Sequence, residues 1–164
     1  LMRSGDQLRH RVTSEKDTVR PDVLMVKLAH PTRAGYDQMI KNLLLVGLGG
    51  GIGSMARYLC QRWFSLQYLH SFPWGTFAVN MAGCFLIGIF WGLSFKTFDG
   101  NESWKLFLMT GLCGGFTTFS AFSLEGIGLI REQKLLLFFL YVAGSVIGGL
   151  LLTWIGMKLV RGNL

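Results

Sequence analysis

The sequence predicts an all-α membrane protein with four transmembrane helices. Of its 164 residues, 51% are hydrophobic and only 15% are charged, a more apolar balance than soluble domains show. Four apolar segments of about 20 residues each are long enough to cross a hydrocarbon core of about 30 Å. The five tryptophans lie near the ends of these segments, where interfacial aromatic residues are found.

The four predicted spans lie at 42–64, 73–95, 104–124 and 135–157. Charged residues gather in the joints, with Lys96 and Asp99 after the second span and Arg131 and Lys134 before the fourth. This distribution supports the boundaries, because a charged side chain is costly inside a bilayer. We expect residues 39–164 to form a single membrane domain.

Residues 1–38 have a different composition. They hold seven of the 16 basic and five of the nine acidic residues, two prolines and no long apolar run. Mixed charge without apolar periodicity is typical of a disordered segment. We therefore expect a disordered N-terminal extension with no part in the function, and a regulatory or targeting tail is the alternative.

Glycine is frequent, with 22 residues, and recurs at spacings of four within the spans. Lipid gives no hydrophobic push between helices, so small residues that allow close backbone approach hold them together. Four helices are few for enclosing a water path, so we also expect an oligomer. The glycine pairs expected to pack are Gly47/Gly51, Gly49/Gly53, Gly88/Gly92, Gly111/Gly115 and Gly144/Gly148.

The run GGFTTFSAF at 114–122 interrupts the third span with poor helix formers. We expect it to weaken or break the helix. Non-helical backbone at membrane depth is tolerated only where it is buried in protein or lines a cavity. Freed carbonyl oxygens can bind a cation, and the positive edges of the three rings, Phe116, Phe119 and Phe122, can face an anion. The run therefore suggests an anion path beside a backbone cation site.

Polar residues inside the spans are the other functional candidates, since lipid makes them costly. Arg57 can extend to the near interface or supply positive potential at a pore mouth. Asn80 can hold helices together or donate its amide to an anion. Tyr141 and Ser145 share one helix face. We place Glu125 at the end of a span, and the absence of a carboxylate from the span interiors argues against a proton- or cation-coupled exporter.

Enzymatic functions find no support in the motifs. The stretch LLLVGLGGGIGS does not complete a GxGxxG dinucleotide fingerprint, and no soluble βαβ unit follows it. Cys60, Cys84 and Cys113 lie singly in apolar segments, as buried free thiols do. We see no metal-binding set, no nucleophile–base pair and no indication of a nucleic-acid partner, and we expect a protein that is not an enzyme.

Three motifs together resemble the Fluc/CrcB fluoride channels. They are GGGIGSMARY at 49–58, GTFAVNMAGCFLIG at 75–88 and GLCGGFTTFSAFS at 111–123, and the likeness covers roughly residues 39–164. The resemblance implies an antiparallel, dual-topology homodimer with two fluoride pores, located in a bacterial inner membrane. It also implies a structural Na⁺ at the dimer centre, bound by backbone carbonyls of the break in the third helix.

The resemblance also assigns roles to residues. The carbonyls of Gly114 and Thr117 would bind Na⁺, and we expect Gly114→Val to be severe because its branched side chain would crowd the break. Phe116 is expected to pack in the core. Ala121 and Gly149 depart from the hydroxyl residues that family members carry. The fluoride path would be formed by Asn80, Phe119, Phe122, Ser120, Thr118, Tyr141, Ser145 and Arg57.

The basic residues provide a separate argument for dual topology. If the spans alternate in direction and residues 1–38 are left out, one side carries five basic residues and the other carries four, whereas the seven basic residues of 1–38 would bias the count. The positive-inside rule needs a larger asymmetry to fix one orientation. The sides hold Lys41, Lys96, Lys105, Lys158 and Arg161 against Arg57, Arg62, Arg131 and Lys134.

We therefore expect a passive channel that exports toxic fluoride down its gradient, with fluoride, a second copy and the lipid bilayer as its partners. A dual-topology small multidrug exporter is the alternative from another class. A non-conducting assembly subunit is a third reading.

Overall fold

The computed structural model describes residues 33–67, 72–95 and 102–162. The chain divides into two compact units, Leu1–Ile40 and Lys41–Leu164, and all contacts below lie within the second. Four helical stretches in the described residues are long and apolar enough to cross a membrane: Arg33–Gln67, Trp74–Ser94, Glu102–Arg131 and Leu135–Arg161. They confirm an all-helical, multi-pass membrane protein.

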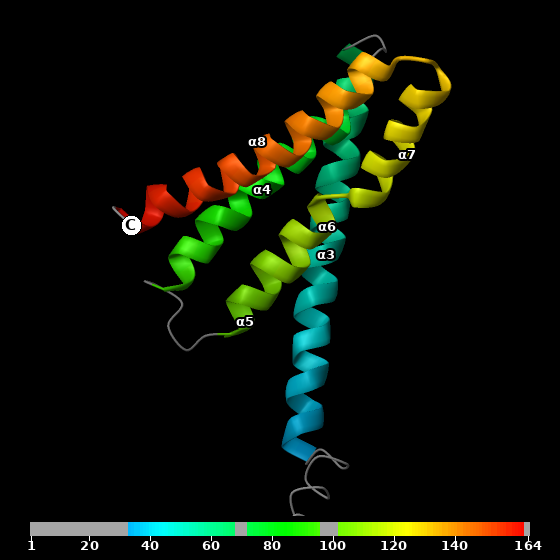
Figure 1. The fold of residues 1–164 in the computed structure, drawn as a ribbon. Helices are drawn as coiled ribbons and strands as arrows, with labels where there is room; N and C mark the ends of the chain where they lie inside the picture. Colours follow the sequence, from blue (N-terminus) through cyan, green and yellow to red (C-terminus); the bar gives the residue numbers. More distant parts are fainter. Residues whose placement is uncertain (1–32, 68–71, 96–101, 163–164) are drawn as a thin grey trace, which may run out of the picture. The chain divides into compact units, whose positions relative to one another are not determined.

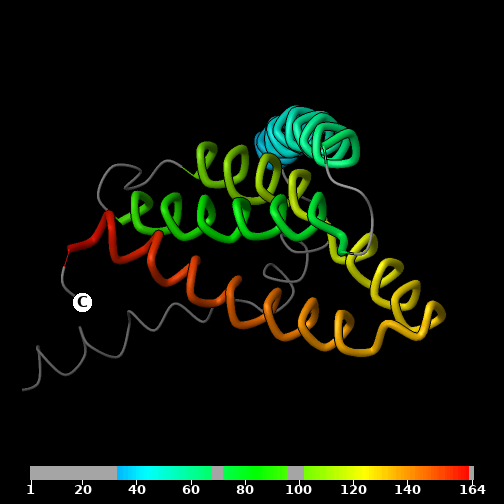
Figure 2. The backbone as a smooth tube through the Cα atoms, turned by 90° about the horizontal axis from the view of Figure 1, so that it is seen from above, coloured from blue at the N-terminus to red at the C-terminus, as the bar shows by residue number. Residues whose placement is uncertain are grey.

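Helices α4 (Trp74–Ser94) and α8 (Leu135–Arg161) run side by side along their length (Figures 1 and 2). Glycine makes this possible on both helices. A Cβ added at Gly88 would overlap the Thr153 carbonyl oxygen, and one at Gly156 would overlap the Phe85 carbonyl oxygen. The Thr153 hydroxyl also donates to the Cys84 carbonyl at 3.0 Å, which adds a polar tie between the helices.

Helix α3 (Arg33–Gln67) approaches the third span through glycine as well. A Cβ added at Gly53 would overlap the Leu112 carbonyl oxygen, and one at Gly115 would overlap that of Gly50. These contacts put backbone directly against backbone. Of the predicted pairs, an added Cβ at either member of Gly49/Gly53 and Gly111/Gly115 would lie 3.1 Å or less from backbone atoms of another helix, and so would one at Gly88. At Gly92, Gly144 and Gly148 its nearest neighbours would instead be side-chain atoms, at 3.0–3.5 Å. At Gly47 and Gly51 an added Cβ would meet nothing within 4 Å.

The third span consists of several pieces. It begins as α5 (Glu102–Lys105), continues as the π-helix η1 (Leu106–Cys113) and ends its first half as α6 (Gly114–Phe116). Thr117 and Thr118 then have extended backbone angles, and α7 (Phe119–Arg131) follows (Figure 1). The Thr118 hydroxyl accepts from the Ala121 N–H at 3.2 Å and so caps α7.

The observed helices extend beyond several of the predicted spans, and two of these differences bear on the predictions. Helix α3 begins at Arg33, so residues 33–38 of the expected extension are helical, while residues 1–32 lie outside the described residues. That the extension has no function stays a prediction.

The position expected for Glu125 is wrong. It lies in the middle of α7, because this helix continues past the apolar run to Arg131. The carboxylate therefore lies within a candidate membrane span, Glu102–Arg131, and the argument from an absent carboxylate no longer applies.

Candidate functional site

Asn80 of α4 lies against the extended residues between α6 and α7. Its Oδ1 accepts from the Thr118 N–H at 2.8 Å, and its Nδ2 donates to the Thr118 carbonyl at 3.0 Å. One side-chain amide thus pairs with both polar backbone groups of a single residue, as a neighbouring strand would. This pairing satisfies backbone groups that the non-helical conformation leaves without helical partners.

The same contacts change the hydrogen bonding of two carbonyl groups. In a continuous α-helix the Thr118 N–H would donate to Gly114, and the Ala121 N–H would donate to Thr117. Here the Thr118 N–H donates to Asn80 and the Ala121 N–H donates to the Thr118 hydroxyl. The carbonyl oxygens of Gly114 and Thr117 therefore lose their helical donors, and these are the two residues expected to supply cation ligands.

The neighbouring carbonyls do have partners. The Cys113 carbonyl accepts from both the N–H and the hydroxyl of Thr117, at 3.0 and 2.9 Å. The Gly115 carbonyl accepts from Arg57 Nε at 3.1 Å and from Ser54 Oγ at 3.4 Å. The Arg57 side chain, which comes from α3, thus lies against the C-terminal end of α6. Arg57 is not among the residues that line the groove described next.

A groove of about 560 Å³ lies beside the break, between α4, η1 and the starts of α6 and α7. The Phe119 and Phe122 rings lie there with their centroids 5.6 Å apart, and Phe119 is 79% exposed in the single protomer. The groove brings together seven of the ten expected site residues: Asn80, Gly114, Thr117, Thr118, Phe119, Phe122 and Ser145.

Two hydroxyl groups extend the polar part of this site. Ser145 of α8 lines the groove, and its buried Oγ has no hydrogen-bond partner among the residues that the structure describes. Such a group is open to an incoming ligand. The Ser120 hydroxyl lies 3.2 Å from that of Thr118, so it belongs to the cap of α7 and not to the groove lining.

Tyr141 is completely buried and has its hydroxyl committed elsewhere. The hydroxyl donates to Glu125 Oε2 at 2.7 Å. Its ring lies 4.9 Å from the Phe122 ring and 5.4 Å from the Phe72 ring, measured between centroids. Tyr141 therefore lies between Phe122, which lines the groove, and Phe72, which lines a second cavity.

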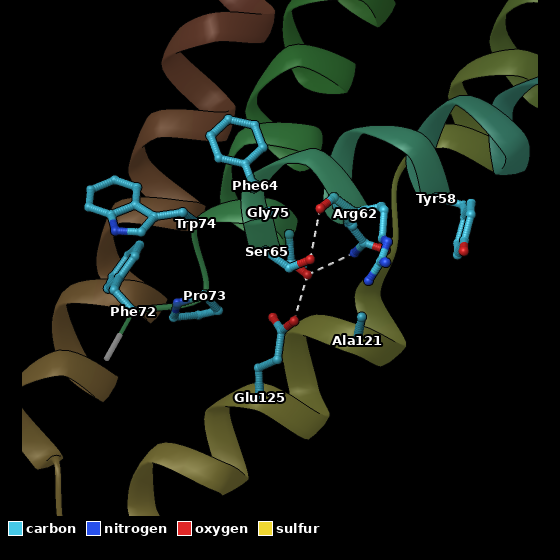
Figure 3. A pocket seen from close by; sticks show the side chains of 12 residues that line it. Tyr58, Arg62, Phe64, Ser65, Phe72, Pro73, Trp74, Gly75, Ala121 and Glu125 are labelled. Carbon is cyan, nitrogen blue, oxygen red and sulfur yellow. Dashed lines mark hydrogen bonds between the residues drawn. The ribbon is translucent and has the colours of Figure 1, made fainter. Parts of the chain in front are cut away.

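The second cavity, of about 490 Å³, lies between the C-terminal end of α3, the start of α4 and the first half of α7 (Figure 3). Arg62, Trp74 and Phe72 line it together with Glu125. Gln61 donates to the Thr76 hydroxyl at 2.9 Å, and Thr76 donates to Glu125 Oε1 at 2.7 Å. Each carboxylate oxygen of Glu125 thus accepts a hydrogen bond from a hydroxyl group.

Sequence reasoning missed this hydrogen-bonded chain of Gln61, Thr76, Glu125 and Tyr141. Its members come from α3, α4, α7 and α8, and no local spacing connects them. The one available signal was Glu125 itself, a carboxylate directly after an apolar run. The structure shows that it is enclosed by hydroxyl donors.

The expected crowding at Gly114 is not found within one protomer. A Cβ added there would meet only the Met109 carbonyl oxygen, at an ordinary distance of 3.9 Å. Phe116 does pack as expected, since an added Cβ at Gly83 of α4 would lie 3.5 Å from its ring. Side-chain metal ligands do not gather in the described ranges, which contain no group of three or more His, Cys, Asp or Glu.

A family model and several known proteins are similar to this chain. Residues 44–157 match the family model described as CrcB-like protein, Camphor Resistance (CrcB). A fluoride-specific ion channel FluC of Phocaeicola vulgatus is 48% identical over 118 residues, covering 72% of this chain and 97% of the relative. The FluC of Flavobacterium psychrophilum is 44% identical over 122 residues, covering 74% of this chain and 98% of the relative.

The FluC of Chlorobium luteolum is 47% identical over 116 residues, covering 71% of this chain and 89% of that protein. The family-model match, residues 44–157, includes α4, the third span and most of α8, which carry the groove and the hydrogen bonds around Thr118. The chain belongs to the CrcB family.

Proposed function

We propose that this chain forms a fluoride-selective channel that lets fluoride leave the cytoplasm down its electrochemical gradient and so reduces fluoride toxicity. The observation that carries this proposal is the groove, which places two phenylalanine rings next to an amide and a free hydroxyl. The relatives named as fluoride-specific ion channels support the choice of ion. The site lies in a multi-pass protein, for which we propose a bacterial inner membrane.

The chemistry of the groove suits a small, strongly hydrated anion. A selective path must replace the water shell of the ion with groups of the protein. The side-chain nitrogen of Asn80 has two N–H groups. One donates to the Thr118 carbonyl, so the other is available in the groove. The Ser145 hydroxyl has its proton available, and the ring edges of Phe119 and Phe122 carry partial positive charge.

The line of aromatic rings gives the path a direction. From the groove it runs through Phe122 and Tyr141 to Phe72, which lines the second cavity. We propose that fluoride passes along ring edges between these two cavities. Glu125 lines the second cavity, where Thr76 and Tyr141 each donate a hydrogen bond to one of its carboxylate oxygens.

We propose that two copies assemble antiparallel, with each chain inserting in either orientation. The exposed Phe119 ring and the open side of the groove need a cover, and a second copy would provide it for both chains. Without residues 1–38, the basic residues, five against four, leave the orientation unbiased. The third span then acts as a broken transmembrane helix whose halves meet at Thr117 and Thr118.

The donor set at the break fits a small hard cation, and we propose a structural Na⁺ there. Gly114 and Thr117 each have a carbonyl oxygen without its helical donor. In an antiparallel pair these give four neutral oxygens around the two-fold axis, without a carboxylate that would favour a divalent ion. A bound Na⁺ would supply positive charge next to the groove, while Asn80 and the Thr118 hydroxyl keep the carbonyls in place.

The multidrug exporter is the weaker alternative, although Glu125 supplies the membrane carboxylate that this function requires. Both oxygens of Glu125 are engaged by buried hydroxyl groups, which leaves neither free for a substrate cation. Family membership also favours the channel.

Reconstitution in liposomes tests the proposed function. Vesicles loaded with potassium fluoride and diluted into isotonic, fluoride-free buffer should release fluoride only when valinomycin lets K⁺ follow, because uncoupled fluoride movement carries charge. Vesicles loaded with chloride should release none. Fluoride release no faster than from protein-free vesicles would rule out the channel. Release driven by a pH gradient without valinomycin would favour a coupled exporter.

A further inference from the structure

The Gly115 carbonyl has an unusual pair of donors. It lies at the C-terminal end of α6, where helical carbonyls run out of partners and the helix dipole is negative. Arg57 Nε donates to it at 3.1 Å, and Ser54 Oγ lies at 3.4 Å. Both donors come from α3, one helical turn apart, and both are only partly exposed.

Arg57 is therefore at the wrong place to act directly on an anion in the groove, whose lining does not include it. We propose that Arg57, supported by Ser54, is a positioning residue that caps α6 and so selects which carbonyl oxygens of the break are available to a cation. This inference rests on the proposed function, since it concerns the cation site of the same channel.

The carbonyl oxygens at this end of the helix differ in whether they have a hydrogen-bond donor, which supports a role for Arg57 in selecting those available to a cation. Cys113 is satisfied by Thr117, and Gly115 by the two donors from α3. Gly114, one residue before Gly115, and Thr117, two residues after it, have lost their helical donors. Without its cap, the Gly115 oxygen would compete with its neighbours for the cation, or α6 would unwind to find another donor.

A matched pair of variants separates capping from charge. In glutamine, Nε2 is the same number of bonds from the backbone as Nε in arginine, so Arg57→Gln keeps a neutral donor at that position. In Arg57→Met, the side chain has the same length as that of glutamine but carries no hydrogen-bond donor. Arg57→Lys keeps the charge on a more flexible stem without the planar fork. Arg131→Met, in the exposed last turn of α7, controls for loss of a basic residue.

The experiment measures two properties of each purified variant. The first is the increase in thermal unfolding temperature when Na⁺ replaces N-methyl-D-glucamine, titrated to give an apparent Na⁺ affinity. The second is fluoride release from liposomes. We expect Arg57→Gln to stay within about twofold of wild type in both. Arg57→Met should bind Na⁺ roughly tenfold more weakly, as expected when one buried carbonyl loses its donor. Ser54→Ala should fall between them.

Several results would overturn the inference. If Arg57→Gln and Arg57→Met reduce fluoride release equally while Arg57→Lys preserves it, the charge of Arg57 matters and its capping hydrogen bond does not. If the Na⁺ affinity of Arg57→Met equals that of wild type and of Arg131→Met, Arg57 has no influence on the cation site. A wild-type protein that gains stability from Na⁺ but releases no fluoride would contradict the proposed channel function. The comparison of Na⁺ affinity between Arg57→Gln and Arg57→Met would still be valid.

Discussion

The amide of Asn80 serves the fold and the proposed path at the same time. Its oxygen and one N–H bind the backbone of Thr118, and its second N–H is left for the groove. The sequence indicated both roles as alternatives, a helix tie or an anion donor, and the geometry allows them together. No spacing in the sequence shows that one side chain faces Thr118 with both groups.

Asn80→Asp tests this double role. Aspartate keeps an acceptor for the Thr118 N–H, but it removes both donors and puts negative charge beside the Thr118 carbonyl. We expect fluoride release to fall at least about tenfold and the protein to lose about 1–3 kcal/mol of stability, the cost of an unsatisfied buried group. Liposome release and thermal unfolding measure the two effects. Unchanged release would remove Asn80 from the path.

The Phe119 and Phe122 rings provide a second test. Isoleucine fills similar space without a positive ring edge. We expect Phe119→Ile and Phe122→Ile each to lower fluoride release at least about tenfold while the protein stays folded. Phe116→Leu is the matched control, because Phe116 packs towards Gly83. If Phe116→Leu were the most damaging of the three in the liposome assay, the pore-facing side would be assigned wrongly.

At the scale of helices, apolar length predicted the four spans well because bilayer thickness sets it. The details that depend on contacts were not predictable. The eight residues of η1 form a π-helix, and no side-chain pattern in LFLMTGLC distinguishes this from an α-helix. Likewise, the hydrogen-bond partners of Glu125 come from two other helices, α4 and α8, so its environment depends on tertiary packing.

Glycine contacts between helices can be tested directly. A Cβ at Gly53 would overlap the Leu112 carbonyl oxygen, whereas at Gly128 of α7 it would meet nothing within 4 Å. We expect Gly53→Ala to destabilise the protein by about 1–3 kcal/mol through forced separation of backbones. Gly128→Ala should be neutral or stabilise by up to about 1 kcal/mol. Thermal unfolding in detergent compares them, and equal melting temperatures would contradict the close approach of α3.

At the scale of the whole molecule, the division of the chain near Ile40 agrees with the change in composition. We expect a protein that starts at Met39 to insert, assemble and release fluoride at the full-length rate. It would lose the first turns of α3 and keep every contact of the groove. Reduced release at equal amounts of reconstituted protein would show that residues 1–38 contribute to the function.

Assembly of two copies gives the last prediction. Gly114 is exposed in the single protomer, and an added Cβ meets only the Met109 carbonyl oxygen, at 3.9 Å. Gly114→Ala should therefore leave one protomer folded. In the proposed dimer, however, two Gly114 residues face each other across the cation site, so each added methyl group would occupy space that the partner needs.

We expect Gly114→Ala to shift the protein from dimer to monomer in detergent and to lower its apparent Na⁺ affinity, with its helical content unchanged. Gly51→Ala serves as control, because it also has open space within one protomer and lies away from the break. Light scattering and circular dichroism provide the measurements. A Gly114→Ala protein that remains dimeric and binds Na⁺ as wild type does would place the two-fold axis elsewhere. The groove would then need a different cover.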